Sequence, residues 1–119
     1  MINTRSQDIA DISGVNFHIV GCGAIGSSVA TQLARLGADN FTLYDYDKVG
    51  IENVGVSQYV HQDIGKTKIE ALYRHLTKID HFIKVNRIPK FKSLDYFYKF
   101  FKKFNYKKHI LKEIKKNLI

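Results

Sequence analysis

Several residue types that mark particular classes of protein are scarce in this chain of 119 residues. Cys22 is the only cysteine, which excludes an internal disulfide, a CxxC redox pair and a cysteine-based zinc site. The five histidines form no HExxH pattern, so we predict no metal site built from the protein's own ligands. The first residues, MINTRSQDIADIS, are polar, and no apolar run approaches the roughly 18 residues of a membrane span. These absences favour a cytoplasmic protein.

The excess positive charge is confined to the last quarter of the chain. Residues 1–89 hold nine Lys or Arg and nine Asp or Glu, whereas residues 90–119 hold ten lysines against Asp95 and Glu113. Pro89, the only proline, marks the same boundary. We therefore expect two parts, a globular domain over residues 1–89 and a basic, amphipathic helical tail over residues 90–119.

Three short apolar runs rich in β-branched or aromatic residues predict strands within the first part. They are NFHIV (16–20), NFTLYD (40–45) and HFIKVNRI (81–88). Helical periodicity separates them, and right-handed crossovers would place the strands in one parallel sheet. The predicted fold is α/β, a Rossmann-like three-layer αβα unit with an incomplete sheet of about three strands.

The segments between these strands have the spacing of amphipathic helices. A helix over residues 24–37 is expected to bury Ile25, Val29, Leu33 and Leu36. A helix over residues 66–80 is expected to bury Ile69, Leu72, Tyr73, Leu76 and Ile79. A further short helix is predicted over residues 6–12.

A glycine-rich turn, GCGAIG, lies between the first strand and its helix. Gly21, Gly23 and Gly26 have the GxGxxG spacing that lets a backbone turn sharply, approach a phosphate and pack a helix on a strand. Ala24 lies at the helix start, and Asp45 ends the next strand, where a ribose hydroxyl would be bound. The pattern predicts nucleotide binding. Cys22, inside the turn, is interpreted as a small filler because no base lies beside it in the sequence.

The polar residues after the second strand distinguish between types of nucleotide. A dinucleotide-binding enzyme needs one acid there, whereas this chain continues from Asp45 to Asp47, Asn53 and the lysines of GKTK. Lys66 and Lys68 start a predicted helix, where cations oppose the macrodipole, so an anionic ligand explains them better than helix propensity does. The set favours a polyphosphate site.

With these motifs, residues 5–88 resemble the ThiF/MoeB/HesA family, the bacterial relatives of ubiquitin-activating enzymes. The resemblance is most specific in DYD…EN…DIGKTK. It implies that the protein binds ATP and adenylates the C-terminal carboxylate of a small ubiquitin-like or sulfur-carrier protein. It implies that Gly21, Gly23 and Gly26 line the phosphates and adenosine and that Asp45 binds the ribose. It also implies that Asn53 and Lys68 contact the phosphates, with Asp47 as a supporting acid near the metal and phosphates.

The chain also departs from the family pattern. Val56 stands where the family has an arginine that neutralises the transferring phosphates, and Gln58 replaces the family glutamine with one residue of slippage. The family's fourth strand, with the acid and asparagine that help to hold magnesium, has no counterpart, nor do its CxxC zinc pair and catalytic cysteine. We therefore expect nucleotide binding, incomplete catalysis and a truncated family member whose magnesium ligand is missing.

The tail begins with SLDYFYKFFKKF, which places Leu94, Phe97, Phe101 and Phe104 at helical spacing. A second basic helix is expected from residue 105 onward. Both are expected to cover the sheet, and neither nucleic acid nor a membrane is expected as their partner. Without a fourth strand, the first strand would be an apolar edge that a second copy or a partner chain could complete.

Two other functions remain open at this point. The domain could bind NAD(P) as part of an oxidoreductase, or the chain could be a non-enzymatic remnant with a partner-binding tail. Asn53 and Lys68 argue against the first, whereas the missing acid of strand four favours the second.

Overall fold

A parallel three-stranded sheet forms the centre of the protein. The computed structural model describes residues 11–91 and 93–103. In chain order the elements are β1 (Asn16–Val20), α2 (Ala24–Arg35), β2 (Asn40–Tyr44), the 3₁₀ turns η1 (Ile51–Asn53) and η2 (His61–Asp63), α3 (Lys68–Ile79), β3 (Lys84–Ile88) and α4 (Leu94–Lys103). The strand order is β1-β2-β3, and Phe17 is in register with Phe41 and Phe41 with Val85. The predicted α/β fold with three parallel strands is confirmed.

β3 begins three residues later than its apolar run suggested. The Asp80 carboxylate accepts the Phe82 N–H at 2.9 Å, and the Asp80 carbonyl accepts the Ile83 N–H at 3.1 Å. These bonds close a turn over His81 and Phe82, and the Phe82 side chain is 78% exposed. The apolar start of the predicted strand is therefore a capped turn.

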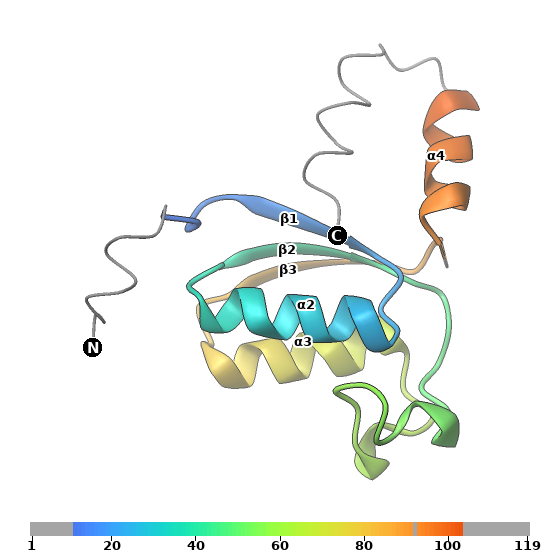
Figure 1. The fold of residues 1–119 in the computed structure, drawn as a ribbon, viewed down its shortest axis with the longest axis horizontal. Coiled ribbons are helices and arrows are strands. Elements are labelled where there is room, and N and C mark those ends of the chain that lie inside the picture. The colour runs from blue at the N-terminus through green and yellow to red at the C-terminus, as the bar shows by residue number, and fades with distance from the viewer. Residues whose placement is uncertain (1–10, 92, 104–119) are drawn as a thin grey trace.

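Helices α2 and α3 cover one face of the sheet (Figure 1). The core between them contains Ile19, Phe41 and Leu43 from the strands and Leu72 and Leu76 from α3. For α3 the predicted stripe is largely confirmed, since Ile69, Leu72 and Leu76 are buried, whereas Tyr73 and Ile79 are half-buried.

The apolar stripe predicted for α2 is confirmed only in part, since Leu33 packs against the core and Val29 is half-buried, whereas Ile25 and Leu36 are exposed. Its buried positions are small residues, namely Gly26, Ser27, Ala30, Thr31 and Ala34. Ile25 and Leu36 are 79% and 62% exposed. The physical reason is close approach, because a Cβ built on Gly26 would lie 2.0 Å from the Gly21 carbonyl oxygen. At Gly26 the helix therefore approaches the glycine turn too closely for any side chain.

The opposite face of the sheet is polar. Thr42 donates to Asn16 Oδ1 at 3.0 Å and accepts from Asn86 Nδ2 at 3.5 Å, so one residue from each strand joins a side-chain ladder. His18 Nδ1 and the Tyr44 hydroxyl lie 2.9 Å apart on the same face. These pairs satisfy polar groups that an apolar helix layer would leave unpaired.

Helix α4 lies on this polar side, at the carboxyl end of the strands (Figure 1). Phe97 is 1% exposed, and its ring meets Tyr44 at a centroid distance of 5.1 Å and Phe91 at 5.5 Å. Phe97 therefore covers the sheet as predicted. The predicted side-chain positions of Phe101 and Phe104, the second tail helix and most of the helix predicted over residues 6–12 lie outside what the structure describes. No helix among the described residues is long and apolar enough to cross a membrane.

Candidate functional site

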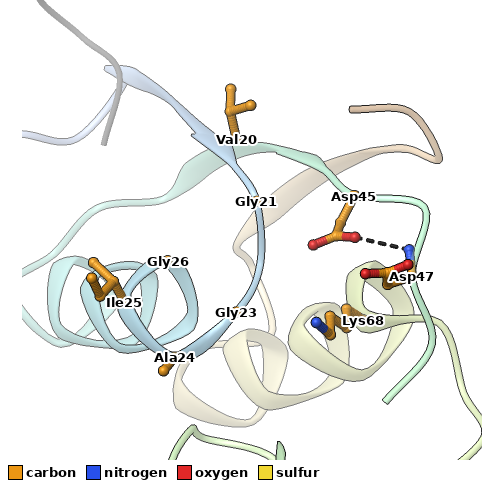
Figure 2. A pocket seen from close by; sticks show the side chains of 9 residues that line it. All are labelled: Val20, Gly21, Gly23, Ala24, Ile25, Gly26, Asp45, Asp47 and Lys68. Carbon is orange, nitrogen blue, oxygen red and sulfur yellow. Dashed lines mark hydrogen bonds between the residues drawn. The ribbon is translucent and has the colours of Figure 1, made fainter. Parts of the chain in front are cut away.

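A cavity of about 440 Å³ opens at the carboxyl edge of the sheet, where β1 and β2 end (Figure 2). Its lining residues are Val20, Gly21, Gly23, Ala24, Ile25, Gly26, Asp45, Asp47 and Lys68. They come from the last residue of β1, the turn that follows it, the first turn of α2, the segment directly after β2 and the first residue of α3. Seven of the eight residues proposed from the sequence are thus brought together, although they span nearly 50 positions of the chain.

The structural requirement for glycine differs among the three glycines of the turn. Gly21 has a φ of 89°, which favours glycine, and its N–H donates to the Tyr44 carbonyl at 2.8 Å. Gly26 allows α2 to approach the turn. Gly23 has an ordinary φ of −79°, and a Cβ there would meet nothing within 4 Å. The fold itself places no steric demand for glycine at this position, so the missing side chain leaves room in the cavity.

Asp45 joins the glycine turn to the loop that follows β2. Its carboxylate is buried, with the residue 2% exposed. Oδ2 accepts the Cys22 N–H at 2.8 Å, and Oδ1 accepts the Asp47 N–H at 2.8 Å (Figure 2). Each carboxylate oxygen keeps further lone pairs for a ligand hydroxyl. Asp45 therefore holds the glycine turn and the loop after β2 together in the absence of a ligand.

Lys68 is the first residue of α3, and its backbone is fixed on both sides. Its N–H donates to the Asp47 carbonyl at 2.9 Å, and Thr67 caps the helix by accepting the Glu70 N–H at 3.3 Å. The side chain lies between the glycine turn and Asp47 (Figure 2). Lys66, by contrast, lines a separate cavity that faces Arg74 and Lys78. Lys66 and Lys68, which the sequence analysis considered together, thus line different cavities.

Cys22 is fully buried in the glycine turn. Burial, together with the neighbouring Asp45 carboxylate, raises the pKa of the thiol far above its usual range, although the Lys68 charge opposes this. A protonated, inaccessible thiol is not a nucleophile. This geometry agrees with the interpretation of Cys22 as a filler.

Asn53 is the one proposed site residue that does not line the cavity. Its side-chain oxygen accepts the Gly50 N–H at 2.8 Å and thereby closes η1. Val56 is 69% exposed and, with Gln58, lines an adjoining cavity of about 430 Å³ that shares Ala24 and Ile25 with the first. Contact between Asn53 and a phosphate stays a prediction.

Three residues at or beside the cavity were not recognised from the sequence as part of the site. Val20 is the last residue of β1, and Ile25 was assigned to the core although it lines both cavities. The position of Ile25 between Ala24 and Gly26, beside a glycine turn, could have indicated its exposure. Tyr59 is buried under the turn, with its hydroxyl 2.5 Å from the Cys22 carbonyl oxygen. Nothing local in the sequence points to this contact.

The described residues contain no group of three or more His, Cys, Asp or Glu side chains that could hold a metal ion. Asp45 and Asp47 are the carboxylates that line the cavity. Magnesium therefore stays a prediction.

Comparison with known proteins gives concordant matches. The family model described as ThiF family matches residues 2–107. The ubiquitin-like modifier-activating enzyme 5 of Drosophila willistoni is 37% identical over 67 residues, which make up 56% of this chain and 16% of that protein. E. coli MccB solved with ATP has a TM-score of 0.64 and 32% identity, covering 71% of this chain and 25% of MccB. MccB solved with selenomethionine MccA has a TM-score of 0.66 and 31% identity, covering 72% of this chain and 26% of MccB. The chain thus spans about a sixth of the curated relative and about a quarter of MccB.

Proposed function

The chain belongs to the ThiF family, and from this premise we propose that its cavity binds ATP for the adenylation of a carboxylate. The carboxylate would be the C-terminus of a small ubiquitin-like or sulfur-carrier protein. In that reaction a carboxylate oxygen bonds to the α-phosphorus, the bond to the leaving phosphate oxygen breaks, and pyrophosphate is released.

The observation that carries the proposal is the convergence of Lys68 and the start of α2 on one cavity. Helix N-termini present backbone N–H groups and a partial positive charge to an anion. Lys68 adds a full positive charge from a second helix start, although that charge is unfavourable for α3 itself. A polyphosphate would offset this cost.

The dimensions and contacts of the cavity support a nucleotide. Its volume of about 440 Å³ falls in the range of about 300 to 1,000 Å³ that is usual for small-molecule sites. The space at Gly23, which no protein atom fills, would admit a phosphate close to the backbone. Asp45 would accept from the ribose through lone pairs that its backbone contacts leave available. Asp47 would lie near the phosphates and the magnesium ion that accompanies them.

A small protein partner is supported by the relatives. The name of the Drosophila willistoni protein states that it activates a ubiquitin-like modifier, and MccB has been solved with MccA. We propose the same class of partner here, a small protein or peptide that presents a carboxylate to the bound nucleotide.

We further propose that this polypeptide binds ATP without completing adenylation. Val56 stands at the position of the family arginine, and its aliphatic side chain, 69% exposed, can neutralise no phosphate. An arginine at such a site is worth several kcal/mol of transition-state stabilisation.

Calorimetry with Mg-ATP and with NAD tests the nucleotide. Lys68→Ala should weaken ATP binding by about 1 to 3 kcal/mol, the range for a lost contact to a charged group. Lys66→Ala is the matched control, because Lys66 lies two residues before Lys68, carries the same charge and does not line this cavity. It should have little effect on ATP binding. Gly23→Ala should preserve the melting temperature but weaken ATP, because the new methyl group enters empty space. Tighter binding of NAD, or equal effects of the two lysine variants, would favour an oxidoreductase domain.

ATP–pyrophosphate exchange, measured with candidate carrier proteins, tests the adenylation step. We expect no exchange above background from the wild-type chain that binds ATP. Robust exchange would mean that other groups replace the arginine. Restoring the charge with Val56→Arg is the complementary variant, and any gain in exchange would identify this position as the deficit.

A further inference from the structure

Tyr59 connects three segments around the candidate site. It lies between η1 and η2, and its side chain is 2% exposed. Its hydroxyl donates to the Cys22 carbonyl oxygen at 2.5 Å and lies 3.4 Å from the Lys68 carbonyl oxygen. One hydroxyl of the loop between β2 and α3 therefore touches both the glycine turn and the start of α3.

This contact completes the fixation of the peptide units around Cys22. The Cys22 N–H donates to Asp45, and its carbonyl accepts from Tyr59. In a trans peptide unit the C=O and the following N–H point in opposite directions, and none of the described peptide bonds is cis. Holding the Cys22 carbonyl toward the buried Tyr59 thus turns the Gly23 N–H away from it. Gly23 lines the cavity, and none of the described residues accepts a hydrogen bond from its N–H.

The Tyr59 ring is itself held in place. It lies edge-on to His75 of α3, with ring centroids 6.3 Å apart, and His75 Nε2 is 2.7 Å from Asp63 Oδ2. Burial, with contributions from nearby negative charges, raises the pKa of the Tyr59 hydroxyl, so this group stays a donor at neutral pH. The donor is therefore buried, oriented and protonated at neutral pH.

We propose that Tyr59 is a positioning residue for the nucleotide site, whose hydroxyl holds the Cys22 carbonyl so that the Gly23 N–H is presented to a phosphate. The role rests on the proposed binding of ATP. It differs from the roles of the lining residues because Tyr59 does not line the cavity and acts through the backbone of the turn.

The test compares Tyr59→Phe, which removes only the hydroxyl, with Thr31→Val. Thr31 is a matched control because its buried hydroxyl also donates to a backbone carbonyl, that of Ser27 at 2.7 Å, within α2. Both variants lose one buried hydrogen bond, but only Tyr59→Phe releases the glycine turn. Their melting temperatures measure the common loss of stability.

Binding of ATP, AMP and adenosine then separates positioning from general stability. Tyr59→Phe should weaken ATP and AMP about 3- to 10-fold, part of the value of one hydrogen bond to a charged group, and leave adenosine unchanged. Thr31→Val should change none of the three. An unchanged ATP affinity in Tyr59→Phe, or an equal loss for adenosine, would overturn the proposal.

Amide hydrogen exchange provides a readout that needs no ligand. In Tyr59→Phe the Cys22 N–H should exchange faster than in the wild type, because the turn is tied down on one side only, whereas Thr31→Val should leave it unchanged. Unchanged protection at Cys22 would contradict the role of the hydroxyl. If the Cys22 N–H exchanges faster in Tyr59→Phe but the wild-type protein binds no ATP, the proposed function is rejected, and with it the role of Tyr59 in phosphate binding. The contact between Tyr59 and the glycine turn would still be supported.

Discussion

The two faces of the sheet are formed by the same three strands but are stabilised by different interactions. On the face under α2 and α3, Phe41 and Leu43 are fully buried in an apolar core. On the other, Thr42 links Asn16 and Asn86 through hydrogen bonds, and Phe97 of α4 supplies apolar cover near the strand ends. Burial of apolar side chains stabilises the first face. On the second face, hydrogen bonds between polar side chains compensate for their removal from water. The cavity lies at the edge where both faces end.

The apolar face should be the more sensitive to truncation. Leu43→Ala removes a fully buried side chain and should lower the free energy of unfolding by about 3 to 5 kcal/mol, through lost transfer energy and a residual cavity. Urea denaturation measures the loss. Leu36→Ala, at a position that is 62% exposed, is the control and should cost far less. Similar losses would show that the core is not where the stability resides.

Removing the aromatic anchor of α4 should have the next largest effect. Phe97→Ala should cost about 3 kcal/mol, the low end for buried aromatic residues, because the ring packs against Tyr44 and Phe91 and is not a member of the main core cluster. Tyr96→Ala tests the adjacent side chain, which is 65% exposed, and should be nearly neutral. Equal melting temperatures for the two variants would mean that α4 does not cover the sheet.

Breaking the polar ladder should have a smaller effect. Thr42→Val keeps the shape of the side chain but removes the hydroxyl between Asn16 and Asn86, at a cost of about 1 kcal/mol. Thr42→Ser, which keeps the hydroxyl, should retain more of the ladder energy after allowance for the lost methyl group. A Thr42→Val protein more stable than the wild type would show that the polar face could be converted to an apolar one.

The pH dependence of stability should provide the finest distinction between the faces. Burial lowers the pKa of His18 on the polar face below its ordinary value of about 6.5. The unfolded state then binds a proton more readily than the folded state, so stability that is fully present above pH 6.5 should be lost as pH falls from that value through the lower pKa of folded His18. His18→Gln should flatten this part of the profile between pH 7 and 5 in thermal melts. An unaltered slope would assign the pH dependence to another group.

The sequence predicted those features that depend on the local backbone. The turn from Gly21 to Gly26 was recognised because sharp turns and close helix packing demand glycine at fixed spacing. Asp45 was recognised because an acid that follows the next strand is part of the same nucleotide-binding pattern. The exposed Ile25 was assigned to the core because its spacing is helical, and only the packed structure shows how closely α2 approaches β1. The start of β3 was misplaced because the Asp80 cap competes with an apolar run.

Long-range contacts account for what could not be predicted at the site. Tyr59 and Cys22 are 37 positions apart, and no periodicity relates them. The different directions of Lys66 and Lys68 depend on where α3 begins, which the Thr67 cap fixes. Asn53 is predicted as a phosphate ligand by resemblance, whereas its amide closes η1 in the structure.

The buried position of the only cysteine makes the protein its own reporter of motion at the glycine turn. Because Cys22 is 0% exposed, a thiol reagent can react only with molecules in which the turn has opened or the chain has unfolded. Each modification is stoichiometric, and no second thiol in the 119 residues obscures the count. The labelling rate therefore measures, without any introduced probe, how often the turn opens or the chain unfolds, and a ligand that closes the turn should slow that rate.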